Sequence, residues 1–62
     1  TLQRALEHLT VRQRTVFNLR IYEELSYEEI AKIMKIKVGT AKATFFQSVE
    51  KIKTIMKEME KK

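Results

Sequence analysis

The chain has one glycine and no proline among its 62 residues. These two residue types interrupt helices most strongly, and leucine, isoleucine, methionine, lysine and glutamate dominate the remainder, which favours helix almost everywhere. No segment has the character of a strand. We therefore predict an all-α fold, with residues 1–62 forming one small four-helix domain.

Two pairs of polar residues mark helix starts. Thr10 precedes Gln13 by three residues, and Ser26 precedes Glu29 by the same spacing. At this spacing each side chain can bond the other residue's free backbone N–H, which is a capping box. We therefore expect a first helix that ends near Leu9, a second that follows Thr10 and a third that follows Ser26.

Each predicted helix has apolar residues at helical spacing, which indicates one inward face per helix. These faces are Leu2, Ala5, Leu6 and Leu9 in the first helix, Val16, Phe17, Leu19 and Ile21 in the second, Tyr27, Ile30, Ala31, Ile33 and Met34 in the third, and Val38, Ala41, Phe45, Val49, Ile52, Met56 and Met59 in the fourth. The fourth helix runs from about Val38 toward Glu58 and spans roughly 30 Å. A three-helix core covers only its first half, so the stripe at Met56 and Met59 frays, meets the first helix or waits for a partner.

The third and fourth predicted helices are joined only by Lys35, Ile36 and Lys37. A connection this short forces a sharp corner, which we expect the side chain of Ile36 to fill. Two helices joined in this way, the second short of acids near its start and with Lys42 facing outward, are typical of a helix-turn-helix. A generic helical bundle or a protein-interaction domain has the same outline.

Composition excludes several functions. Without cysteine there can be no disulfide and no thiolate metal site, and a single histidine, His8, excludes a histidine-rich metal centre. Neither a carboxylate pair nor a nucleophile with its base is visible, so we predict no enzyme activity and no cofactor. No apolar run approaches the roughly 20 residues of a membrane span, and no signal peptide is evident, so the expected location is the cytoplasm.

The positive charge lies in the second half of the chain. Residues 1–31 carry four arginines and five acidic residues, whereas residues 32–62 carry nine lysines and three acidic residues. A basic half on a small domain suits a polyanion, either nucleic acid or an anionic membrane surface, although a solvated lysine-rich surface has the same composition. Glu50, Glu58 and Glu60 interrupt the basic tail, which argues against the membrane.

A series of short motifs extends from Leu9 to Ile52. They are Leu9-Thr10, Arg12-Gln13-Arg14, Val16-Phe17, Leu19-Arg20, Leu25-Ser26-Tyr27-Glu28-Glu29-Ile30-Ala31, and Val38-Gly39-Thr40 followed by Lys42. In this order they resemble region 4 of bacterial sigma factors, particularly the extracytoplasmic-function group. The run from Ser26 to Ala31 recurs in other helix-turn-helix families, notably LuxR-type regulators, but the Gly-Thr pair favours the sigma family.

The resemblance implies a winged-helix-like core and a long C-terminal recognition helix that enters the major groove of duplex DNA. Gly39 leaves room for a DNA backbone at the helix start, where free N–H groups and the helix dipole favour a phosphate. Thr40 can add a hydroxyl there, or it only caps the helix. Lys42 can reach a phosphate or a guanine edge. Arg20 and Tyr27 would hold phosphates at the flanks, as their counterparts do in the family; the alternatives are a salt bridge from Arg20 to Glu23 or Glu24 and a half-buried packing role for Tyr27.

Base contacts are expected from Ala43, Phe46 and Gln47, together with Lys42. The Gln47 amide can pair with adenine, and the Phe46 ring can lie against a thymine methyl. Departures from the family bear on these contacts. Where many members have Gly-Thr-Val-Lys-Ser-Arg-Leu and further arginines, this chain has Ala41, Ala43, Thr44, Gln47 and Val49. The loss of three arginines should weaken DNA contacts by about 1–3 kcal/mol per bidentate pair.

The corner between the last two helices also departs from the family. Lys35 replaces the usual glycine of the turn, and Lys37 replaces the usual serine cap. Both changes should lower the stability of the corner between the two helices. Both also add positive charge near the DNA groove, where Lys37 would help to bind DNA.

Two functions remain open. The first is recognition of the promoter −35 element as duplex DNA, with the RNA polymerase core, through its β flap, as the protein partner. The second is a protein-interaction module that engages the flap or an anti-sigma factor through the stripe ending at Met56 and Met59. A LuxR-type regulator is a further alternative. The missing arginines favour the interaction module, whereas Gly39, Thr40 and Lys42 favour DNA.

Overall fold

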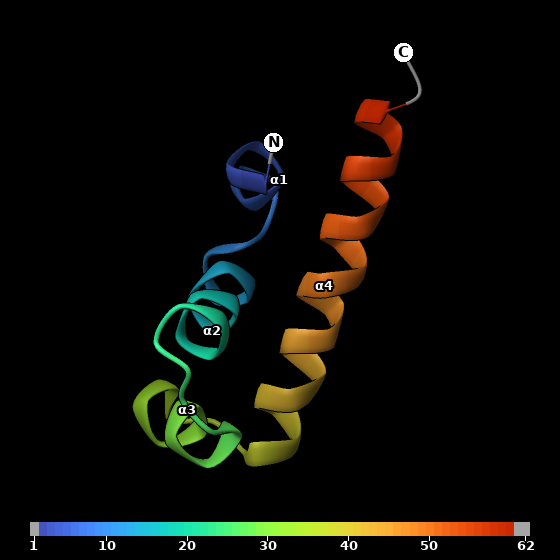
Figure 1. The fold of residues 1–62 in the computed structure, drawn as a ribbon. Helices are drawn as coiled ribbons and strands as arrows, with labels where there is room; N and C mark the ends of the chain where they lie inside the picture. Colours follow the sequence, from blue (N-terminus) through green and yellow to red (C-terminus); the bar gives the residue numbers. More distant parts are fainter. Residues whose placement is uncertain (1, 61–62) are drawn as a thin grey trace.

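The computed structural model describes residues 2–60, with side chains from residue 3 onward, and these residues form four helices and no strand (Figure 1). The helices are α1 (Leu2–Glu7), α2 (Val11–Ile21), α3 (Tyr27–Met34) and α4 (Val38–Glu60). The predicted all-α class and helix order are confirmed. The side chain of Leu2, and residues 61–62 of the basic tail, lie outside the described part.

Both capping boxes are present. The Thr10 hydroxyl accepts from the Gln13 N–H and the Gln13 amide oxygen accepts from the Thr10 N–H, each at 3.1 Å. At the start of α3 the Ser26 N–H donates to the Glu29 carboxylate at 2.9 Å, and the Glu29 N–H donates to the Ser26 hydroxyl at 3.1 Å. Hydrogen bonds from the Ser26 backbone, and secondarily from its side chain, lower the pKa of Glu29 below 4.5.

The corner between α3 and α4 is made by a residue in the left-handed conformation. Lys35 has φ 58° and ψ 45°, and its N–H donates to the carbonyl of Ala31. A residue with a Cβ pays roughly 1–2 kcal/mol for this conformation, which explains why glycine is usual at such a position. Ile36 is half-buried against the core beneath the corner, as expected.

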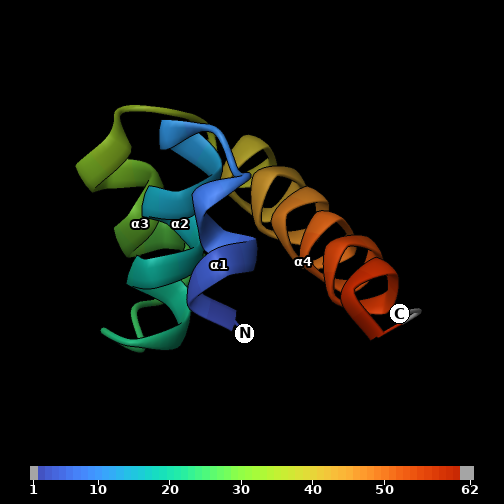
Figure 2. The same ribbon diagram turned by 90° about the horizontal axis from the view of Figure 1, so that it is seen from above.

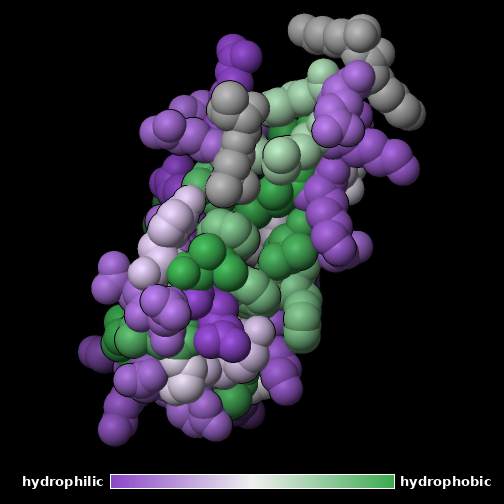
Figure 3. Space-filling view, in the orientation of Figure 1, coloured by the Kyte–Doolittle hydropathy of each residue, from purple (hydrophilic) through white to green (hydrophobic). Residues whose placement is uncertain are grey.

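The long helix α4 contacts each of the other three, which lie one after another along one side of it (Figures 1 and 2). Two buried clusters form the core. One joins α1, α2 and α4 through Ala5, Leu9, Phe17 and Ile52, and the other joins α2, α3 and α4 through Val16, Ile30, Ala31 and Ala41. Figure 3 shows hydrophobic residues gathered between α4 and the α1–α2 side, with hydrophilic residues at the margins.

The middle and distal parts of α4 differ in how far they are covered. Ile52 is buried with Ala5 and Leu9, and Ile55 packs against the same cluster. Met59 is half-buried, whereas Met56 remains exposed. The expectation concerned Met56 and Met59, and of these two the structure partly covers Met59 and leaves Met56 with a free surface.

Besides Met56, three residues assigned to inward faces are exposed: Ile21 by 46%, Ile33 by 58% and Val38 by 42%. Ile33 was placed with Ile30 and Met34, but it lies about 60° from Ile30 around the helix axis on the side away from Tyr27, Ala31 and Met34, so it falls outside the arc that packs against the core. Ile21 ends α2 at the rim of a surface hollow, and Val38 begins α4 beyond the reach of the core. These three assignments were wrong.

Two polar residues take the place of apolar ones at the crossing of α2 and α4. Thr44 and Ser48 are both buried, and the Ser48 hydroxyl lies 3.0 Å from the carbonyl oxygen of Gln13 and 2.8 Å from that of Thr44. Hydrogen bonding removes the cost of burying the hydroxyl. The small side chains let the two helices approach closely, so the buried face of α4 is centred nearer to Ser48 than the apolar pattern predicted.

Candidate nucleic-acid interface

The first half of α4 has a solvent-facing side opposite its buried side. Gly39, Lys42, Ala43, Phe46 and Gln47 are exposed, and we call them the outer face. The inward positions of the same segment are occupied by the buried residues Ala41, Thr44 and Ser48. Of the six contact residues predicted in this part of α4, these five are exposed and Thr40 is half-buried. Phe46 is 55% exposed although its side chain is large and apolar.

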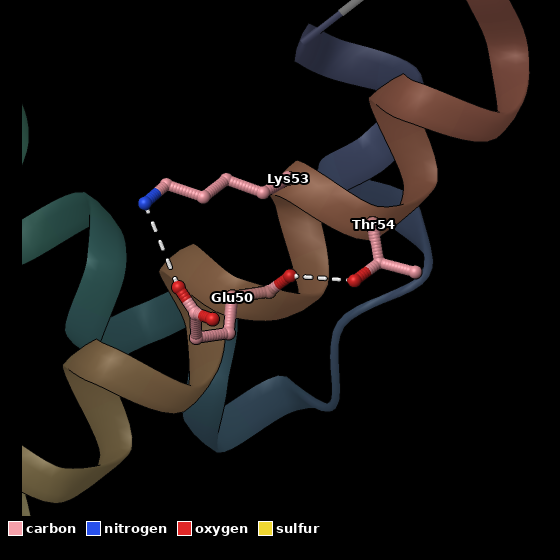
Figure 4. Close-up of polar contacts among 3 residues, drawn as sticks. All are labelled: Glu50, Lys53 and Thr54. Atoms are coloured by element: carbon pink, nitrogen blue, oxygen red, sulfur yellow. Dashed lines mark hydrogen bonds and ion pairs between the residues drawn. The ribbon is translucent and has the colours of Figure 1, made fainter.

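The outer face lies in a segment without acidic residues. Residues 30–49 contain four lysines, at positions 32, 35, 37 and 42, and no aspartate or glutamate. All four lysines are exposed. The next carboxylate, that of Glu50, lies 3.5 Å from the Nζ of Lys53, and the Thr54 hydroxyl donates to the Glu50 carbonyl at 3.0 Å (Figure 4). The four lysines give this segment a net positive charge, which suits a polyanion.

The start of α4 leaves backbone donors available. The Ala41 N–H donates to the Lys37 carbonyl at 2.9 Å, so the N–H groups of residues 38–40 precede the first intrahelical bond. A Cβ added to Gly39 would meet no atom within 4 Å, and its φ is not positive. The fold therefore does not require glycine at this position. Thr40 is half-buried beside it.

A cluster of aromatic and cationic side chains borders the outer face. The Tyr27 ring centre lies 4.8 Å from the Cζ of Arg20 and 5.8 Å from the Nζ of Lys42. Arg20 also donates from Nη1 to the carbonyl of Leu25 at 3.0 Å. Within residues 3–60, Arg20 forms no ion pair with Glu23 or Glu24, the partners considered from sequence. The structure thus brings Arg20, Tyr27 and Lys42, from three different helices, into one group.

Tyr27 also packs against the core, so the packing role considered from sequence is real. Its ring meets Phe45 edge-on at 6.0 Å between ring centres, and Phe45 in turn lies 6.0 Å from Phe17 and from the exposed Phe46. Beside this group a surface hollow is lined by Arg20, Ile21, Glu24, Tyr27 and Phe45. Periodicity alone could not have found this arrangement.

The positions at which the chain departs from the family differ in burial. Ala41 and Thr44 are buried, and Val49 is half-buried against the core. Where the family motif has its arginine, this chain has the buried Thr44, and an arginine there would have to leave the helix packing before it reached a partner. Among the positions that depart from the family, only Ala43 and Gln47 lie on the outer face.

The described residues contain no group of three or more histidine, cysteine, aspartate or glutamate side chains placed to hold a metal ion. Among residues 2–60, no helix combines the length and the apolar character needed to cross a bilayer.

Residues 1–52 match the family described as sigma-70, region 4. The chain is also 38% identical over 52 residues to the RNA polymerase sigma-H factor of Pseudomonas aeruginosa, a match that covers 84% of this chain and 27% of that protein. The chain thus spans about a quarter of the length of this relative. No solved structure matches it significantly.

Proposed function

The chain belongs to the sigma-70 region 4 family, and from this premise we propose that it binds the −35 element of promoters as duplex DNA. In doing so it would direct RNA polymerase to promoters at the start of transcription. The motifs from Leu9 to Lys42 support placing it in the extracytoplasmic-function group. The role needs no catalytic residue and belongs in the cytoplasm.

The observation that carries this proposal is the outer face of α4. A helix is about 10–12 Å across with its side chains, which fits a major groove about 12 Å wide. The exposed side chains of this half of α4 lie in the acid-free segment from 30 to 49. A groove-facing helix needs this combination of exposure and positive charge.

We assign the contacts in two groups. Phosphates would be bound by Lys37, by the N–H groups around Gly39, by Thr40 and Lys42, and at the flank by the group containing Arg20 and Tyr27. Base edges would be contacted by Ala43, Phe46 and Gln47, with Lys42 at the boundary. Phosphate contacts supply affinity and register, whereas contacts to base edges supply sequence preference.

The test is binding to a library of duplex promoters at two salt concentrations. Lys42→Ala should weaken binding to all sequences and reduce the slope of log K against log salt by up to about one unit if the lysine contacts phosphate alone. Gln47→Ala should instead relax preference at one base pair. Lys57→Ala is the matched control, because Lys57 is exposed on the same helix but lies ten residues beyond Gln47.

The two functions proposed from sequence give different results in this assay. If the native chain binds no duplex at low salt, the DNA proposal is wrong and the interaction module stands. If Lys57→Ala weakens binding as much as Lys42→Ala, the outer face has no special role, and binding depends only on total charge.

We also propose a contact with the RNA polymerase core through the β flap, or with an anti-sigma factor, at the distal part of α4. Met56 is exposed there, beside the half-buried Ile55 and Met59. Met56→Glu should weaken binding to a purified flap fragment without changing duplex DNA affinity. An unchanged affinity for both a flap fragment and an anti-sigma factor would reject this surface.

A further inference from the structure

Tyr27 is the first residue of α3, and its ring contacts cations from the two neighbouring helices. The guanidinium of Arg20, on α2, lies 4.8 Å from the ring centre, and the ammonium of Lys42, on α4, lies 5.8 Å from it. Both distances fall within the roughly 6 Å over which a ring attracts a cation. The two cations are far apart in sequence, and this ring is what they share.

The Tyr27 ring is fixed by the core rather than by its hydroxyl. Phe45 meets it edge-on with 63° between the ring planes, and Phe45 lies nearly parallel to the buried Phe17, at 15°. Within residues 3–60 the Tyr27 hydroxyl has no hydrogen-bond partner. A chain of ring contacts therefore runs from the core to the surface and ends at Tyr27.

Arg20 has a second restraint. Its Nη1 donates to the carbonyl of Leu25 at 3.0 Å, in the loop that precedes α3. A guanidinium has five N–H donors, so four remain for a ligand. Arginine and lysine side chains each carry about 2 kcal/mol of rotamer entropy, part of which is lost on binding. Restraining them before binding lowers that loss.

We propose that Tyr27 is a positioning residue: its ring holds Arg20 and Lys42 in place for DNA phosphates, and its hydroxyl contributes no essential contact. The inference rests on the proposed DNA binding and changes the role given to Tyr27 there. The direct binders of phosphate are the two cations. Tyr27 acts through them by restricting where their charges lie.

Two substitutions at Tyr27 separate the ring from the hydroxyl. Tyr27→Phe keeps the ring, so duplex affinity should stay within about twofold of the native value. Tyr27→Leu keeps an apolar side chain for the core but removes the ring, and it should weaken binding roughly 5- to 30-fold, since two exposed cation–ring contacts are lost. Tyr22→Leu is the matched control, because Tyr22 is 59% exposed and takes part in no ring or cation contact among the described residues.

A double-mutant cycle adds a readout that a purely structural role would not move. Arg20→Ala should weaken binding strongly in the native chain and less in the Tyr27→Leu chain, because the arginine is no longer held there. Additive effects in this cycle would overturn the proposal. So would a tenfold or larger loss in Tyr27→Phe, which would assign the phosphate contact to the hydroxyl.

Nuclear magnetic resonance of the free chain tests the placement of the cations without DNA. Ring-current shifts of the Arg20 δ and Lys42 ε protons should be present in the native chain and in Tyr27→Phe, and absent in Tyr27→Leu. Their absence from the native chain would overturn the proposal even if Tyr27→Leu proved too unstable for binding assays. If the shifts are present but the native chain binds no duplex, the cation placement is correct and the DNA function is what fails.

Discussion

Gly39→Ala separates what the fold needs from what a DNA ligand needs. Gly39 lies in the first turn of α4, is exposed and does not have a positive φ. An added Cβ has no atom within 4 Å. Nothing in the protein therefore opposes the substitution.

The expected effect on stability is favourable. Glycine in a helix is less favourable than alanine by up to about 1 kcal/mol, and the full amount applies only away from helix ends. Because Gly39 lies in the first turn, we expect Gly39→Ala to raise the free energy of unfolding by about 0.5 kcal/mol or less. For a domain of this size that corresponds to a rise in Tm of up to roughly 4 °C.

The expected effect on DNA binding has the opposite sign. If a phosphate lies against the first turn of α4, the new methyl group separates it from the backbone N–H donors. A hydrogen bond to a charged group contributes about 1.5–3 kcal/mol, so the dissociation constant should rise at least tenfold. The substitution should thus yield a more stable protein that binds DNA less well.

Thermal unfolding followed by circular dichroism, and duplex binding by fluorescence anisotropy, measure the two effects. Thr54→Ala is the control, because it also replaces an exposed helical residue, whose hydroxyl bonds back to the Glu50 carbonyl, with a better helix former. It should raise Tm without changing DNA affinity. Gly39→Ala with native affinity would refute the close approach of DNA, and a lowered Tm would refute the open environment of Gly39.

Three further effects concern the fold. Lys35→Gly should raise stability by about 1 kcal/mol in chemical denaturation, because glycine adopts the left-handed corner without a Cβ penalty; an unchanged stability would contradict the strain assigned to Lys35. Ser48→Val should cost about 1–3 kcal/mol by overpacking the crossing of α2 and α4, whereas Ser48→Ala should cost about 1 kcal/mol or less; equal costs would show that the hydroxyl, not space, decides. Because the folded pKa of Glu29 is depressed below 4.5, its contribution to stability is present above the unfolded pKa and is lost as the pH falls through the folded value. The free energy of unfolding, measured by urea titration at pH values around these two pKa values, should depend less on pH in Glu29→Gln than in the native chain. Identical pH profiles for the two chains would rule out the Glu29 carboxylate as a source of this dependence.

Much of the candidate interface follows from local rules. The capping box at Ser26 sets where α3 begins, and the three-residue corner at 35–37 then fixes where α4 begins. Once α4 begins at Val38, helical periodicity decides that Lys42, Phe46 and Gln47 lie on its outer side. None of this needs knowledge of distant contacts, so it could be predicted from sequence.

The contacts between helices could not be predicted in this way. Apolar periodicity placed Ile21 and Ile33 inside and gave no sign that Ser48 would be buried. Whether a residue at the edge of an apolar arc is covered depends on the angle at which the next helix crosses. A small polar residue is buried only where that crossing is close and a carbonyl, such as that of Gln13, is in reach.

The all-α class, the starts of α2 and α3 and the outward position of the α4 residues follow from the amino-acid order alone, because each depends on interactions within a few residues. Helix packing, by contrast, brings Arg20, Tyr27 and Lys42 together, connects them to the core through Phe45, and makes Thr44 unavailable to a partner. These features arise where three helices pack together. Packing geometry follows from the shapes of all the side chains at the contact, not from the pattern of any one helix.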